Sequence, residues 1–119
     1  MSIFYETAIH TDQIETVEFS ADHHRVHIPV WVASTNSRSK KTFEYTVHVS
    51  VELADRNEKP STTIYNAQGN MVHAAKFDRL RDTALETVNA EMGVQLVRKQ
   101  EMDLETVNTL REKMGLARI

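Results

Sequence analysis

The stretch that decides the fold is Phe43-Glu-Tyr-Thr-Val-His-Val-Ser-Val-Glu-Leu53, in which an apolar residue occupies every odd position. Successive side chains of a β-strand point to opposite faces, so this alternation is typical of a strand with one buried face and one wet face. Residues 43–53 are therefore predicted to form a strand of a sheet that is covered on one side.

A second alternating stretch lies just upstream, at residues 24–33. Its even positions from 26 to 32 are apolar, and its odd positions carry mixed side chains: His27, Pro29, Trp31 and Ala33. The polar segment 34–41 between the two stretches contains three serines and Asn36, residue types that favour turns. The pattern predicts an antiparallel hairpin.

The two alternations limit the register of this hairpin. If paired residue numbers add up to 75, the apolar residues of both strands share one face, whereas a slip of one residue would expose one set to water. A slip of two residues keeps the faces and remains an alternative. With a sum of 75, the outer pairs are His27 with His48, Trp31 with Glu44, and Arg25 with Ser50. Because proline has no N–H to donate, we expect 24–33 to be an edge strand or Pro29 to lie at a bulge.

Weaker strand signals occur at residues 3–9, 14–19 and 62–65. Together with the hairpin they predict an antiparallel meander of four or five strands over residues 3–65. The pattern then changes at Asn70, a candidate N-cap, and apolar residues recur at three- and four-residue steps up to Met92. This predicts a long helix over residues 71–92, ended by Gly93.

A shorter amphipathic helix is predicted over residues 103–114, capped by Asp103, after a short strand or extended link at 94–98. Strands followed by helices indicate a single α+β domain over residues 1–119, with the long helix on the apolar face of the sheet. The sequence Leu-Glu-Thr-Val-Asn occurs at both 85–89 and 104–108, either through duplication of a helix or by coincidence.

The composition excludes several function classes. The 119 residues include no cysteine, so disulfides and thiolate chemistry are absent, and the three glycines cannot form a dinucleotide or Walker fingerprint. No cofactor is therefore expected. No apolar run approaches a membrane span and no secretory signal is evident, so we expect a cytoplasmic protein that does not contact a membrane. The net charge of −3 disfavours a dedicated nucleic-acid binder.

The six histidines raise the question of a metal site. Facing imidazoles of His27 and His48, with a carboxylate nearby, would be a weak Zn²⁺ or Ni²⁺ candidate. The simpler interpretation is that polar positions of a wet strand face hold histidine, and we predict no metal. A small ligand-binding or acid–base enzyme that uses His27, His48 and Glu44 in a sheet–helix cleft is an alternative, but no reaction class is indicated and no catalytic residue is assigned.

The preferred functional interpretation of the sequence depends on Trp31, the only tryptophan. An aromatic side chain on a wet strand face is a common contact anchor, because it buries a large area at a small entropic cost. With Pro29 and Arg25 beside it, Trp31 predicts a non-enzymatic protein-interaction module: a small intracellular adaptor, inhibitor or assembly protein. We expect it to self-associate, as a homodimer, through the edge at 24–33 or through the last helix.

The other alternative is nucleic-acid binding through the basic turn of Arg38, Lys40 and Lys41, helped by Arg25 and by stacking on Trp31. Phosphate contacts would make such binding weaken steeply with salt. The net negative charge of the chain counts against this hypothesis.

Overall fold

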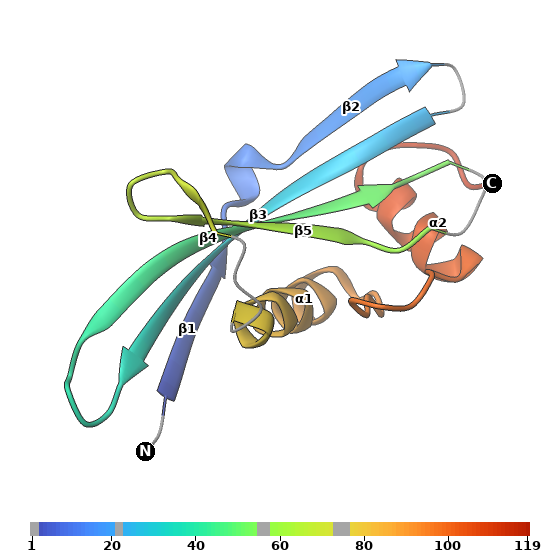
Figure 1. The fold of residues 1–119 in the computed structure, drawn as a ribbon. Coiled ribbons are helices and arrows are strands. Elements are labelled where there is room, and N and C mark those ends of the chain that lie inside the picture. Colours follow the sequence, from blue (N-terminus) through green and yellow to red (C-terminus); the bar gives the residue numbers. More distant parts are fainter. Residues whose placement is uncertain (1–2, 21–22, 55–57, 73–76) are drawn as a thin grey trace.

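The structure, a computed structural model, describes residues 3–20, 23–54, 58–72 and 77–119. In these residues one antiparallel sheet packs against two α-helices, which confirms the predicted α+β fold (Figure 1). The strands are β1 (Ile3–Ile9), β2 (Glu15–Ser20), β3 (His23–Asn36), β4 (Thr42–Glu52), β5 (Ser61–Asn66) and β6 (Met71–Val72). The helices are the 3₁₀ turn η1 (Thr11–Gln13), α1 (Asp78–Met92) and α2 (Leu104–Lys113).

The sheet order is β1-β3-β4-β5-β6, and β2 also pairs with β3. β1 pairs with residues 30–36 of β3. β2 pairs with residues 23–27 of β3, along the same edge of that strand as β1. β3 is therefore an internal strand, and the prediction that 24–33 forms an edge is wrong. The meander holds from β2 to β6, while β1 lies end to end with β2.

The place of Pro29 explains how a proline fits inside the sheet. The Pro29 carbonyl accepts a hydrogen bond from the His10 N–H at 3.0 Å, so its backbone faces the side of β1 and β2. On that side β1 has already ended at Ile9, and β2 does not begin until Glu15. The missing N–H of Pro29 thus coincides with a gap between two short strands, and no bulge is needed.

The hairpin of β3 and β4 has a register in which paired residue numbers add up to 77, as in Val30 with Val47. The predicted sum of 75 is wrong, and the alternative slipped by two residues is correct. The turn decides between them. Asn36 accepts hydrogen bonds through its side chain from the N–H groups of Arg38 and Ser39, and the chain closes on Lys41 with Lys40 at a φ of 60°.

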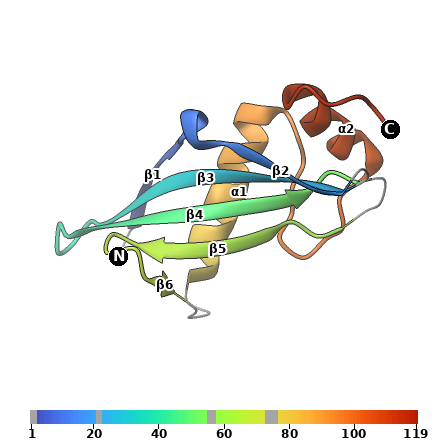
Figure 2. The same cartoon turned by 90° about the horizontal axis from the view of Figure 1, so that it is seen from above.

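The inner face of the sheet carries the core, and α1 lies across it (Figure 2). The alternating apolar residues are fully buried over most of the hairpin, as their periodicity predicts: Val26, Ile28, Val30, Val32, Val47, Val49 and Val51. Towards the turn, Tyr45 is half-buried and Phe43 is exposed, so the prediction of a buried position is wrong for Phe43. The buried residues pack against Leu80, Ala84, Leu85, Val88 and Met92 of α1. α2 adds Val107 and Leu110 to the same cluster. The predicted helix-on-sheet packing is confirmed.

The long helix begins later than predicted, at Asp78 rather than at residue 71. Asn70 does not cap it. Instead, the Asn66 side chain accepts hydrogen bonds from the N–H groups of Gln68 and Asn70, and this turn sends Met71 and Val72 back along β5 as β6. The predicted helix end at Gly93 is confirmed, with a left-handed φ of 68°. Asp103 caps α2 as predicted, by accepting from the Thr106 N–H at 2.8 Å.

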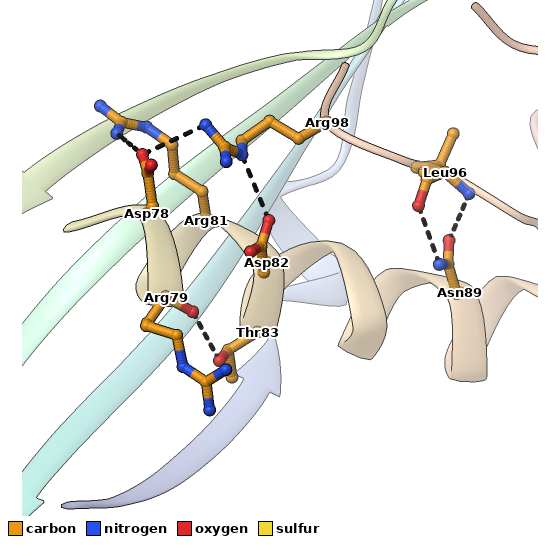
Figure 3. A network of polar contacts seen from close by, with 8 residues as sticks. All are labelled: Asp78, Arg79, Arg81, Asp82, Thr83, Asn89, Leu96 and Arg98. Carbon is orange, nitrogen blue, oxygen red and sulfur yellow. Dashed lines mark hydrogen bonds and ion pairs between the residues drawn. The ribbon is translucent and has the colours of Figure 1, made fainter. Parts of the chain in front are cut away.

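An extended link over residues 94–98 returns along the polar side of α1 (Figure 3). Arg98 from this link forms ion pairs with Asp78 and Asp82 at 3.1 and 3.2 Å. The side-chain amide of Asn89 donates a hydrogen bond to the Leu96 carbonyl and accepts one from the Leu96 N–H. The charged side of α1 is therefore partly used to hold the link rather than left to solvent.

Candidate functional site

Both helices contribute to the core on the inner face, and within the described residues no helix covers the opposite side of the sheet (Figure 1). We call this side the outer face. It is formed by the strand residues that alternate with the core positions, among them Phe4, Glu6, Ala8, Glu15, Val17, Arg25, His27, Pro29, Trp31, Ala33, Thr35, Thr42, Glu44, Thr46, His48, Ser50, Glu52, Ser61, Thr63, Tyr65 and Met71.

Trp31 lies near the middle of the outer face and is half-buried. Its indole Nε1–H donates to Glu44 Oε1 at 3.1 Å. The predicted contact of these two residues is therefore present, but it is diagonal, because Thr46 lies directly opposite Trp31. A shallow hollow of about 220 Å³ opens beside the indole ring, lined by Trp31, Glu44, Tyr45, Thr46, Asn66 and Ala67.

Tyr65 is a second aromatic residue of this face and was not among the predicted contact residues. Thr46 separates it from Trp31 in the same row of the sheet. The rings of Tyr65 and His48 pack in a T-shaped arrangement, with centroids 5.1 Å apart and an interplanar angle of 79°. The signal for Tyr65 was present in the sequence, because Ile64 points inward in a predicted strand and its neighbour must then point outward.

His48 is the histidine whose surroundings change its protonation. Burial lowers the pKa of His48 below its ordinary value of 6.5, and the nearby charges of His27 and then His10 lower it further. His27 does not lie directly opposite His48 as predicted. Pro29 takes that position, and His27 faces Ser50. Within the described residues no group of three histidine or acidic side chains is placed to hold a metal ion, and His73 lies outside them.

The lowered pKa of His48 predicts a pH-dependent stability. Well above pH 6.5 the imidazole is neutral in both states, whereas below it the unfolded chain binds a proton that the folded protein resists. The free energy of unfolding should therefore fall as the pH decreases through 6.5. Thermal unfolding at pH 7.5 and 5.5 checks this: His48→Asn should lose less stability on acidification than the wild type. His23→Asn, at the end of β3, is the control and should behave like the wild type; equal losses in all three proteins would contradict the prediction.

Arg25 lies near one end of β3 and is half-buried. Its guanidinium donates to Ser50 Oγ and Glu52 Oε2, both at 3.4 Å, and Glu52, not Ser50, is its direct partner in the register. Glu52 is only 3% exposed, and its second carboxylate oxygen has no hydrogen-bond partner among the described residues. Of the other predicted contact residues, Pro29 is buried and Trp31 is partly open.

The basic turn lies far from the rest of the predicted nucleic-acid site. Arg38, Lys40 and Lys41 are exposed at the tip of the β3–β4 hairpin, which projects beyond α1 (Figure 1). Arg25 is eleven residues from the turn residue Asn36 on the same strand, which corresponds to about 36 Å. The structure does not bring these cations together.

The set proposed for an enzyme is also not arranged as expected. His27, His48 and Glu44 belong to the outer face, whereas the sheet–helix boundary is on the inner face. A second hollow, of about 390 Å³, lies near the hairpin and is lined by Thr42, Phe43, Glu44, Tyr45, Asn66, Ala67, Gln68, Val72 and Phe77. The rings of Tyr45 and Phe77 meet there with centroids 5.4 Å apart. The described lining of this hollow combines three aromatic residues with polar ones and includes Glu44 but no histidine.

Comparison with protein families, with curated proteins and with solved structures gives no significant match for this chain. Among the described residues, no helix combines the length and the apolar character that crossing a bilayer requires.

Proposed function

We propose that this chain is a non-enzymatic protein-interaction module whose contact surface is the outer face around Trp31. The observation that carries the proposal is that this face has no covering helix in the described residues and yet holds the indole of Trp31 and the paired rings of Tyr65 and His48. Trp31 on β3 and Tyr65 on β5 lie in the same row with one strand, β4, between them, and the ring of His48 packs against Tyr65. Rigid aromatic side chains that remain partly open are the usual anchors of protein interfaces.

The charges of the outer face indicate the chemistry of the partner. Glu52 is buried and pairs with Arg25, so the exposed charges of this face are the carboxylates of Glu6, Glu15 and Glu44. Such a surface repels phosphate groups and favours basic side chains. The expected partner is therefore a protein segment that places an apolar side chain on the indole ring and Lys or Arg beside Glu44. Nucleic acid is the less favoured ligand of this face.

Trp31→Glu is expected to weaken partner binding by about thirtyfold or more, the usual effect of losing an interface hot spot. The experiment immobilises the wild type, Trp31→Glu and Trp31→Phe, identifies retained proteins by mass spectrometry, and then titrates the purified partner. Circular dichroism checks that each variant is folded. Trp31→Phe keeps a ring on the face and should retain most of the affinity.

The matched control is Val97→Glu, because Val97 is 51% exposed on the link and lies away from the outer face. It introduces the same charge and should leave binding unchanged. If folded Trp31→Glu and Val97→Glu bind the partner equally well, the outer face is not the contact surface.

A further inference from the structure

The free side of β1 offers an unpaired row of backbone groups. β1 pairs with β3, and no strand pairs with its other side among the described residues; Figure 2 shows β1 at the margin of the sheet. The His10 N–H donates to the Pro29 carbonyl, so His10 and Pro29 form a hydrogen-bonded pair. Such pairs alternate along an antiparallel ladder. Phe4, Glu6 and Ala8 therefore turn their backbone toward β3, while Ile3, Tyr5, Thr7 and Ile9 turn theirs outward.

β1 lacks the features that usually protect an edge strand. It contains no proline and no lysine, its pairing with β3 is regular over all seven residues, and its one charged residue is Glu6. Two large apolar side chains at its start remain open: Ile3 is 46% and Phe4 is 61% exposed. The neighbouring edge strand β2 differs, because Glu15 and Glu18 are two charges within six residues. β1 is thus the more favourable edge for adding a strand.

We propose that β1 pairs antiparallel with β1 of a second copy of this chain, so that two sheets join into one continuous sheet. An antiparallel edge is complementary to itself, because a two-fold axis sets each outward N–H opposite an outward carbonyl. This proposal deepens the proposed interaction module by naming one partner, but it uses the backbone edge of β1, with Phe4 and Glu6 at the β1 margin of the outer face, and not the surface around Trp31.

Charge selects the register of this pairing. An axis at Glu6 would set two carboxylates directly opposite each other, which is destabilising. An axis at Tyr5 sets Phe4 opposite Glu6 and Ile3 opposite Thr7, and so gives both exposed apolar side chains a cross-strand neighbour. An axis at Thr7 would leave Ile3 beyond the end of the partner's β1. An axis at Phe4 would pair only residues 3–5 of the two β1 strands, whereas the axis at Tyr5 pairs residues 3–7. The Tyr5-centred register is therefore the one proposed.

A charge exchange tests both the edge and the register. Light scattering after size exclusion, over a wide range of concentrations, should give the wild type a mass of twice 13.6 kDa. Phe4→Glu creates a like-charge pair with the partner's Glu6 on both sides of the axis, and it should raise the dimer dissociation constant by about tenfold or more. Phe4→Glu combined with Glu6→Lys replaces repulsion by attraction and should restore the dimer.

Two controls separate this proposal from its alternatives. Phe43→Glu changes a residue of similar exposure, 56%, on a different strand, and should leave the dimer unchanged. Trp31→Glu should also leave the dimer unchanged, since the indole is not on the edge. If Trp31→Glu lowers binding of the protein partner but not the dimer, the result supports the outer-face contact and leaves the β1 pairing intact. A wild type that is monomeric throughout, or a dimer that Phe4→Glu does not weaken, would overturn the proposal. Failure of Glu6→Lys to restore the dimer would overturn the Tyr5-centred register.

Discussion

Ile28→Ala is expected to lower the free energy of unfolding by about 2–5 kcal/mol. Ile28 is fully buried in the middle of β3, opposite Val49, on the face that α1 covers. Truncation removes apolar contacts and leaves a cavity that the packed core around Ile28 can close only in part. Urea unfolding followed by circular dichroism measures the difference.

The matched control for this prediction is Val97→Ala, which shortens an exposed apolar side chain. Its effect should stay within about 0.5 kcal/mol, because few contacts are lost at the surface. If Ile28→Ala costs no more than Val97→Ala, the assignment of the even residues of β3 to the inner face is wrong.

Asn89→Asp is expected to cost about 2–3 kcal/mol at neutral pH. The Asn89 amide accepts from the Leu96 N–H at 2.7 Å and donates to the Leu96 carbonyl at 3.0 Å (Figure 3). A carboxylate keeps the first hydrogen bond but sets an oxygen against the buried carbonyl, which then has no donor. The same unfolding measurement should show part of the loss recovered in acid, where a protonated carboxyl can donate again.

Gln68→Glu is the control for Asn89→Asp, since it makes the same chemical change in an exposed hairpin turn. It should change stability little. Equal effects of the two substitutions would mean that the link over residues 94–98 is not held by Asn89.

Much of the fold could be predicted from hydrophobic periodicity, because burial on one face imposes it. The alternation in β3 and β4 placed Val30 and Val47 correctly on the inner face. The same alternation could not distinguish a register sum of 75 from 77, since both bury the same residues. The turn made that choice through the Asn36 side chain and through Lys40, a non-glycine residue with positive φ, for which the sequence has no clear signal.

The errors at β6 and at Pro29 have a common cause in tertiary pairing. Met71 and Val72 fit the apolar pattern of a helix as well as that of a short strand, and the turn at Asn66 selects the strand. The prediction from Pro29 assumed one continuous neighbouring strand. The interruption between β1 and β2 is a property of the whole sheet, and local composition does not show it.

The candidate site was predicted in part. The Trp31–Glu44 contact was expected from a register that proved wrong, and it survives because a diagonal neighbour is still within reach of an indole ring. Tyr65 was overlooked, although its position next to the inward-facing Ile64 in a strand places its side chain on the outer face. The separation of Arg25 from the basic turn follows from the length of β3, which extends to Asn36 and not only to residue 33.

The gap opposite Pro29 also divides the sheet's margin into two separately held pieces. β1 is held by residues 30–36 of β3 and by a hydrogen bond from Thr87 to Thr7, whereas β2 is held by residues 23–27. Release of one piece does not break the hydrogen bonds of the other, so the two can open as distinct units of local unfolding. The N-terminal strand could thus leave the sheet and return while β2 and β4 keep the other half of β3 in place.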